Sequence, residues 1–375
     1  MTAPMDTQVL DRPTARRPAQ TRIAIADCDI HPSPKSIEKE VFPFLDKRWQ
    51  HHMQTYGSLP RHGYQNGPAY PKGQPDAARR DAYPPNGGRP GSDLEFMREH
   101  HLDPLNVQLG ILNPLRSGQG MQNLDFAIAY CRAINEWQVA EWTSKEPRLK
   151  ASIVVPYEDG AASAREIERC AGNRDYAQVL LLSRTADPAG QRRYWPIYEA
   201  AAAAGLPVAI HAFGYGGSPV SGSGWPSYYI EEMVGHSQCS QALLTSMIFE
   251  GVFERLPTLK LVLVESGFAW LPPLAWRLDK LATRMHDETP HLSMLPSEYI
   301  RRQVWLTTQP MEEPEPRKHL LDTIDWIGWD RLLFATDYPH WDFDDPQFVL
   351  PPKVGEAQRQ KFFMDNARAV YADRL

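Results

Sequence analysis

Short apolar runs recur along the chain, and most of them end in a polar residue. The runs are rich in Val, Ile and Leu and do not alternate strictly between apolar and polar positions, which is typical of parallel strands buried on both faces. This pattern predicts strands at Ile23–Asp29, Val107–Asn113, Ala151–Pro156, Ala177–Ser183, Pro207–His211, Leu259–Glu265, Gln303–Thr308 and Arg331–Asp337.

Segments with helical periodicity separate most of these strands. Between residues 124 and 143, apolar side chains recur at spacings of three and four residues, as on the buried face of a helix. The same periodicity predicts helices at Ala161–Cys170, Arg192–Ala204, Gln241–Leu256, Trp270–His286, Arg317–Ile327 and Glu356–Tyr371.

Strands that alternate with helices predict an α/β fold in which a parallel sheet closes into a (β/α)8 barrel, or TIM barrel. The alternative is a doubly wound open sheet, which predicts a glycine-rich phosphate-binding turn after the first strand. The chain has Cys28-Asp29-Ile30-His31-Pro32 there, so the barrel is favoured. We predict one barrel domain over residues 22–375, preceded by a flexible tail over residues 1–21.

A long segment, residues 46–106, interrupts the alternation between the first and second strands. It is rich in Pro, Gly and aromatic residues, and a loop of this length is more often functional than idle. We expect it on the catalytic side of the barrel, as a lid or as a contact between subunits. The alternative is a flexible surface decoration.

The composition and charge of the chain argue against several classes of function. The formal net charge of −6 argues against a general nucleic-acid binder, because the chain has no excess of positive charge to attract phosphate groups. The chain has no apolar run long enough to span a membrane, and its polar N-terminus does not resemble a secretory signal. Its 4 cysteines are scattered without CxxC spacing, so we expect no disulfides and a cytoplasmic location.

The strand ends carry the candidate chemistry, because side chains at the C-terminal ends of barrel strands converge on one mouth. Asp29 and His31 follow the first strand on one face, two residues apart. His211 ends the fifth strand, Glu265 the sixth and Asp337 the eighth. A lone histidine at a strand end is more often structural, but together these residues predict one divalent metal, zinc first and manganese as the alternative.

Further side chains near the strand ends are candidates for substrate binding. Arg184 would clamp a carboxylate through two hydrogen bonds, or pair with an acid on a neighbouring helix. Asn113 and Arg116 would bind substrate or stabilise a loop, and His340 would contact substrate or support Asp337. Trp225, together with Tyr228, Tyr229 and Trp341, would suit a flat organic substrate, although aromatic residues more often pack in cores.

The remaining histidines lie outside the predicted strand ends. We expect surface positions for His51, His52, His100 and His101. His236 precedes a predicted helix, where a capping or exposed position is expected.

These motifs resemble the amidohydrolase superfamily, in the branch that contains aminocarboxymuconate semialdehyde decarboxylase and γ-resorcylate decarboxylase. The resemblance extends from Asp27 to about Tyr371. It is carried by Asp27-Cys28-Asp29-Ile30-His31-Pro32, Pro207-Val208-Ala209-Ile210-His211, Gly251-Val252-Phe253-Glu254-Arg255-Leu256-Pro257, Phe334-Ala335-Thr336-Asp337-Tyr338-Pro339-His340 and Asn366-Ala367-Arg368-Ala369-Val370-Tyr371.

The resemblance implies that His31 and His211 are metal ligands and that Asp337 binds the metal and exchanges a proton. It also implies a homodimer or homotetramer. Relatives carry His or Glu at the place of Asp29, so an oxygen ligand there is compatible. The chain departs from the decarboxylase relatives on the sixth strand, where they have a His followed by glycines and this chain has Glu265.

Three functions follow as hypotheses. The first is hydrolysis of an amide, ester or lactone bond in a small organic substrate by metal-activated water, with Asp337, Glu265 and His211 as catalytic residues. The second is nonoxidative decarboxylation of an aromatic or enoic acid, with Asp337 protonating the carbon that loses carbon dioxide. The third is a binding barrel without catalysis. Because Glu265 stands where the decarboxylases have a histidine, we expect hydrolysis rather than decarboxylation.

Overall fold

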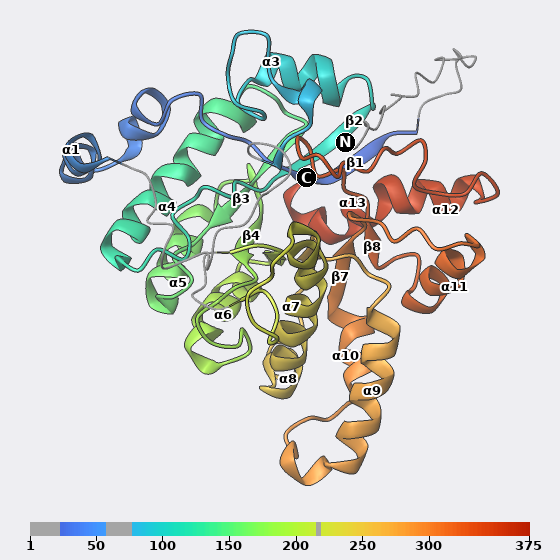
Figure 1. The fold of residues 1–375 in the computed structure, drawn as a ribbon. Helices are drawn as coiled ribbons and strands as arrows, with labels where there is room; N and C mark the ends of the chain where they lie inside the picture. The colour runs from blue at the N-terminus through green and yellow to red at the C-terminus, as the bar shows by residue number, and fades with distance from the viewer. Residues whose placement is uncertain (1–22, 58–76, 215–218) are drawn as a thin grey trace, which may run out of the picture.

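The structure is a computed structural model that describes residues 23–57, 77–214 and 219–375. The predicted tail and residues 58–76 of the predicted insertion lie outside the described residues. Parallel strands form one sheet in sequence order, with helices arranged around it (Figure 1). The strands are β1 (Ile25–Ile30), β2 (Val107–Leu112), β3 (Leu149–Val154), β4 (Tyr176–Leu182), β5 (Val208–His211), β6 (Leu261–Val264), β7 (Val304–Thr307) and β8 (Leu332–Leu333).

The sheet curls until its last strand meets its first. The backbone N–H of Cys28 in β1 donates to the carbonyl of Phe334 after β8 at 2.9 Å, and that of His31 donates to the carbonyl of Tyr338 at 2.8 Å. Every residue of β1, β4, β5 and β6 is buried, as expected for strands covered on both faces. The predicted (β/α)8 barrel is confirmed.

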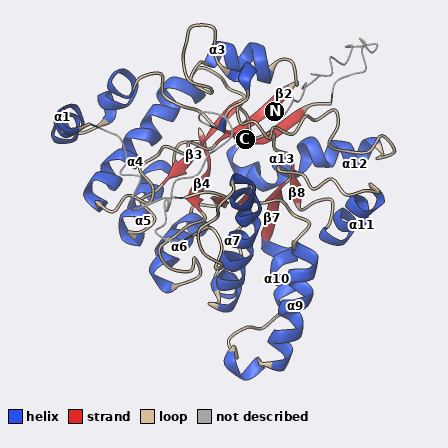
Figure 2. Cartoon of the chain, in the orientation of Figure 1, coloured by secondary structure: helices blue, strands red, loops and turns tan. Residues whose placement is uncertain are grey.

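Helices cover the outside of the barrel, around the central strands (Figure 2). The helices are α1 (Lys47–Tyr56), α3 (Leu94–Met97), α4 (Leu124–Gln138), α5 (Gly160–Cys170), α6 (Trp195–Ala203), α7 (Tyr229–Phe249), α8 (Val252–Arg255), α9 (Leu271–Arg284), α10 (Pro296–Gln303), α11 (Lys318–Ile327), α12 (Glu356–Gln360) and α13 (Asn366–Tyr371). The prediction of one helix over Gln241–Leu256 is wrong. The helix α7 begins at Tyr229, and Gly251 at φ 82° separates it from α8 because a left-handed residue cannot continue a helix.

The strands β6 and β8 end before the carboxylate residues that the sequence pattern placed at their ends. The apolar runs extend to Glu265 and Asp337, whereas β6 stops at Val264 and β8 at Leu333. Glu265 has φ 53° and Asp337 has φ 63°, a left-handed conformation that is uncommon for residues other than glycine. Such conformations concentrate at functional sites, where surrounding contacts maintain them. The two carboxylates therefore project from turns and not from extended strands.

The described part of the insertion packs against the loops that follow β1 and β8. Gly91 has φ 71°, and a Cβ added there would lie 2.2 Å from the carbonyl oxygen of His31. Ala78 forms an antiparallel bridge with His340. The insertion therefore borders the mouth of the barrel. Its roles as a lid or as a subunit contact remain predictions.

A buried carboxylate, Glu146, ties this insertion to the barrel. It accepts hydrogen bonds from the Nε atoms of Arg98 in the insertion and Arg148 before β3, both at 2.8 Å. The hydrogen bonds from Arg148, followed by those from Arg98, outweigh burial and lower the pKa of Glu146 to about 2. The ionised form is therefore the one that stabilises the fold.

We expect Glu146→Gln to lower the free energy of unfolding by about 1–3 kcal/mol at pH 7, because two guanidinium groups lose a charged acceptor. Because the pKa of Glu146 is lower in the folded state than in the unfolded state, its carboxylate stabilises the fold fully above about pH 4.5. This contribution is lost as the pH falls toward about 2. Urea unfolding at pH 7 and pH 3 measures both effects, with the exposed Glu250→Gln as control. An equal loss at the two pH values would contradict the assignment.

Two further features concern the whole described chain. All four cysteines are free, and three of them are buried. Among the described residues, no helix is long and apolar enough to cross a membrane.

Candidate metal centre

The centre begins with two buried side chains at the end of β1. The Nε2 atom of His31 lies 3.3 Å from Oδ1 of Asp29. The other ring nitrogen of His31, Nδ1, donates to the backbone carbonyl of Asn113 after β2 at 2.7 Å. This hydrogen bond fixes the ring and leaves Nε2 for a metal, an arrangement common to histidine ligands.

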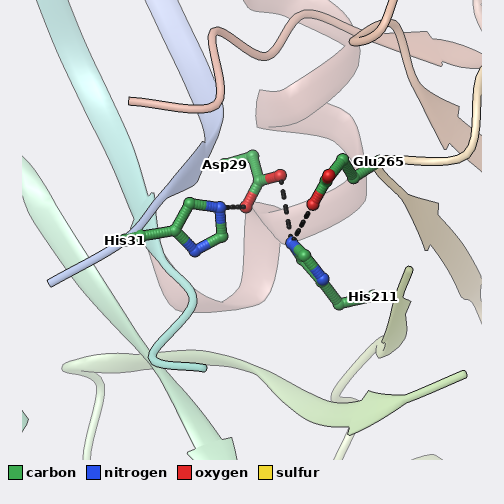
Figure 3. A group of neighbouring side chains, drawn as sticks. All are labelled: Asp29, His31, His211 and Glu265. Carbon is green, nitrogen blue, oxygen red and sulfur yellow. Dashed lines mark ion pairs between the residues drawn. The ribbon is translucent and has the colours of Figure 1, made fainter. Parts of the chain in front are cut away.

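His211 at the end of β5 is arranged in the same way. Its Nδ1 donates to the backbone carbonyl of Ala212, and its Nε2 lies 3.4 Å from Oδ2 of Asp29 and 3.0 Å from Oε2 of Glu265. Figure 3 shows Asp29, His211 and Glu265 pointing toward one another from different segments of the barrel. Closure of the barrel thus brings together groups that lie far apart in the sequence.

Asp337, in the turn after β8, is fully buried and has partners on both carboxylate oxygens. Its Oδ1 accepts from Nε2 of His31 and from Nδ1 of His340, each at 2.7 Å. Its Oδ2 accepts from Nε2 of Gln309 at 3.2 Å. The rings of His31 and His340 are stacked, with centroids 4.4 Å apart.

These side chains form two overlapping groups that could hold a divalent ion. The ligand atoms of each group lie within 4.8 Å of one another, and the groups are Asp29, His31, His211 and Glu265, and His31, Glu265, Asp337 and His340. Imidazole nitrogens with carboxylate oxygens suit zinc or manganese. Oδ2 of Asp29 and Nε2 of His211 are buried and make no hydrogen bond within the described residues, which fits a cation as their partner.

The electrostatics of the centre also favour positive charge. Burial alone would lower the pKa of both imidazoles, but Asp29 raises that of His31, and Asp29 with Glu265 raises that of His211 to about 10. Although burial disfavours its ionised form, Asp29 has a pKa held below the ordinary value by the two imidazoles. Protons therefore occupy the positions in which a metal would be bound.

Asp337 and His340 are shifted in opposite directions. Burial raises the pKa of Asp337 to about 6, against the opposing effect of His31. Burial, and then the nearby His31, lowers the pKa of His340 to about 4. The carboxyl group of Asp337 therefore changes its ionisation closer to neutral pH than an exposed aspartate does.

Asn113 supports the centre by a hydrogen bond to Asp29. Its Nδ2 donates to Oδ1 of Asp29 at 2.8 Å, while its Oδ1 accepts from Ser152 at 2.9 Å and from Gln178 at 3.0 Å. The side chain is fully buried. The structure therefore places Asn113 as a partner of Asp29 and not on a surface open to substrate.

Of the other predicted substrate residues, His340 belongs to the second ligand group, whereas Arg116, Arg184 and Trp225 lie outside both groups. Arg116 is exposed, and Trp225 is partly exposed ahead of α7. Arg184, after β4, donates to the carbonyl of Gly214 at 3.3 Å, and burial lowers its pKa. Their roles in substrate binding remain predictions.

The aromatic residues predicted to suit a flat substrate are only partly brought together. The rings of Tyr229, at the start of α7, and Trp341, in the loop after β8, lie with centroids 6.3 Å apart. Nε1 of Trp341 donates to the hydroxyl of Tyr229 at 3.4 Å. Tyr228 is largely exposed.

Sequence reasoning missed the contribution of the seventh strand. Thr307 accepts from the backbone N–H of Glu265 at 3.0 Å, and Gln309 donates to Asp337. Asp342, a partner of Gln309, has a pKa raised to about 8 by burial and then by Asp337 and Glu265. The signal was available, because Thr307-Thr308-Gln309 is a polar cluster at a predicted strand end.

Two expectations about histidines are wrong. His101 is 1% exposed, and its Nε2 donates to Asp27 at 2.8 Å, because the insertion folds back onto β1. His236 is 6% exposed and lies within α7, since this helix begins well before the predicted start. His100 is partly buried, whereas His51 and His52 are exposed.

Comparisons with known proteins agree with the resemblance stated from the motifs. The γ-resorcylate decarboxylase of Polaromonas sp. strain JS666 is 25% identical over 288 residues, covering 74% of this chain and 86% of that protein. The 2-amino-3-carboxymuconate-6-semialdehyde decarboxylase of Dictyostelium discoideum is 24% identical over 250 residues, covering 65% of each chain.

A solved structure shares the fold. It is the 5-carboxyvanillate decarboxylase of Novosphingobium aromaticivorans with bound manganese and 3-methoxy-4-hydroxy-5-nitrobenzoic acid, at a TM-score of 0.68 and 19% identity, covering 93% of this chain and 97% of that one. These relatives are decarboxylases, so the comparisons favour the alternative hypothesis over the expected hydrolysis. That structure holds manganese, and the two ligand groups of this chain are of a kind that could hold a divalent ion, but neither observation selects zinc.

The match that decides the family is to the amidohydrolase profile (Amidohydro_2), which covers residues 26–372. This range includes both ligand groups and all of the barrel strands except Ile25, the first residue of β1. The chain belongs to the amidohydrolase family.

Proposed function

We propose that this protein is a metal-dependent, nonoxidative decarboxylase of a small aromatic carboxylic acid. The observation that carries the proposal is the position of Asp337, a buried carboxylate beside a set of metal-type ligands, with a pKa raised to about 6. The decarboxylases among the relatives support the reaction class. In this proposal, the ligands are Asp29, His31, His211 and Asp337.

A divalent ion held by these ligands would supply the positive charge that binds the substrate carboxylate and a neighbouring oxygen. Asp337 in its acid form donates its proton to the ring carbon that bears the carboxylate. The bond between that carbon and the carboxylate then breaks, its electron pair returns to the ring, and carbon dioxide leaves. Asp337 remains as a carboxylate and takes up a proton from solvent before the next turnover.

His340 has a supporting role in this scheme. Its Nδ1 donates to Oδ1 of Asp337, and its ring stacks on His31. The lowered pKa of His340 favours the neutral form of its ring near pH 7. It therefore holds Asp337 through a neutral hydrogen bond.

By the resemblance of the motifs, Glu265 takes the place at which decarboxylases of the family carry a histidine. Its Oε2 lies 3.0 Å from Nε2 of His211, and its backbone is fixed by Thr307. We assign Glu265 either to the orientation of His211 or to the ligand set as an additional member, because its carboxylate lies close enough to the imidazole to share a cation with it. Proton donation to the ring is left to Asp337.

Assays of the manganese-loaded chain with hydroxybenzoic acids, their methyl esters and their amides test the proposal. The panel includes 2,6-dihydroxybenzoate and 5-carboxyvanillate. We expect carbon dioxide and the decarboxylated phenol from at least one acid, measured by headspace analysis and chromatography, and loss of both after chelation. Hydrolysis of esters or amides without carbon dioxide from any acid would favour the hydrolase hypothesis.

A further inference from the structure

The end of the seventh strand supplies no ligand to either metal group, yet its side chains hold the residues that do. Thr307 fixes the backbone of Glu265, and Thr308 accepts from the backbone N–H of Ala335 at 3.3 Å, two residues before Asp337. Gln309 follows, and it is 0% exposed. This strand end therefore acts on the turns that follow β6 and β8.

Gln309 makes the most specific of these contacts. Its Nε2 lies 3.2 Å from Oδ2 of Asp337, 3.0 Å from Oδ2 of Asp342 and 3.2 Å from the backbone carbonyl of Asp342. Two carboxylates face the same end of the side chain, so the amide must present its donor end to them. The Oε1 atom then points the other way, where it is buried without a hydrogen bond to the described residues.

One end of this side chain is unfavourable for stability. A buried amide oxygen without a hydrogen bond to the described residues destabilises the fold, whereas the Nε2 end is satisfied by two buried carboxylates. Buried unsatisfied groups of this kind often have a functional role. Gln309 can act on Asp337 through its Oδ2 atom, because His31 and His340 already hold Oδ1.

We propose that Gln309 is a positioning residue for Asp337. By holding Oδ2, it fixes the rotation of the carboxylate so that Oδ1 faces the metal ligands and Oδ2 stays aligned for proton transfer. The same amide ties Asp337 to Asp342 and therefore to the loop that carries His340. The inference rests on the proposed function in one respect, which is the catalytic part assigned to Asp337.

Gln309→Met tests the proposal, because methionine keeps the length of the side chain and removes the donor. We expect kcat to fall roughly 10–100-fold, with KM changed by less than about threefold, since groups that orient metal ligands have effects of this size. Gln309→Asn keeps the donor on a shorter side chain and is expected to retain more activity than Gln309→Met. A purely structural role would not separate kcat from KM in this way.

A second measurement does not depend on activity. Titration of the metal-free chain with Mn²⁺, followed by electron paramagnetic resonance, is expected to show roughly tenfold weaker binding in Gln309→Met. The exposed Gln347→Met is the matched control and is expected to leave Mn²⁺ binding unchanged. Thermal unfolding of each variant confirms that it is folded.

The outcomes are distinct. If Gln309→Met keeps kcat and Mn²⁺ affinity within about twofold of the wild type, Gln309 does not position Asp337. If Gln309→Met does not fold, Gln309→Asn decides by the same two measurements. If the wild type releases no carbon dioxide from any acid, the proposed function fails, and the Mn²⁺ titration alone decides the role of Gln309.

Discussion

Asp337→Asn is expected to lower decarboxylation by roughly 10²–10⁴-fold, because the asparagine amide keeps the shape of the carboxyl group but has no proton of suitable acidity to donate. The loss should appear in kcat for every acid that the wild type accepts. Since Asp337 is also a proposed ligand, Mn²⁺ content is measured in the same samples and activity is expressed per bound ion.

The control for this variant is Asp287→Asn, which changes the same chemical group at an exposed position. It is expected to leave kcat within about twofold of the wild type. Full activity per bound Mn²⁺ in Asp337→Asn would remove Asp337 as the acid. Glu265 would then be the next candidate, because it belongs to both ligand groups.

Mn²⁺ binding is expected to release protons, and its apparent affinity is expected to rise with pH. The pKa of His31 is raised well above its ordinary value and that of His211 to about 10, which favours the doubly protonated, imidazolium form of both rings in the metal-free chain. A metal ligates the neutral ring, so each bound ion displaces up to two protons. The apparent affinity then increases by up to about 100-fold per pH unit below these pKa values.

Isothermal titration calorimetry at pH 7 measures this effect in two buffers with different enthalpies of ionisation. The difference between the observed heats gives the number of protons released. His211→Asn should reduce that number by about one, whereas the exposed His286→Asn should leave it unchanged. Heats that do not depend on the buffer would show that the rings are already neutral before the metal binds.

The two predictions examine different parts of the same centre. Proton release depends on the imidazoles that face Asp29 and Glu265, and catalysis depends on the carboxyl group of Asp337. A chain that binds Mn²⁺ with proton release but decarboxylates nothing would retain the metal centre and lose the proposed reaction. In that case hydrolysis, the first expectation from the sequence, would be the favoured reaction.

The sequence by itself determined the barrel and the candidate ligands that lie at regular strand ends. Parallel strands buried on both faces require continuous apolar runs, and this local signature located all eight strands. Asp29, His31 and His211 could be predicted because each stands at or directly after the end of such a run. Their convergence follows from barrel closure, which any eight-stranded parallel barrel imposes.

Only the tertiary structure decided how the acids are oriented and what supports them. The left-handed turns at Glu265 and Asp337 are maintained by contacts from other strands and leave no pattern in the local sequence. Gln309 was missed because an amide is not a typical metal ligand and its partner lies 28 residues further along the chain. The burial of His101 depends on Asp27, 74 residues away. Local periodicity reports which face of a segment is buried, whereas the partner of a buried polar group depends on chain closure that no single segment encodes.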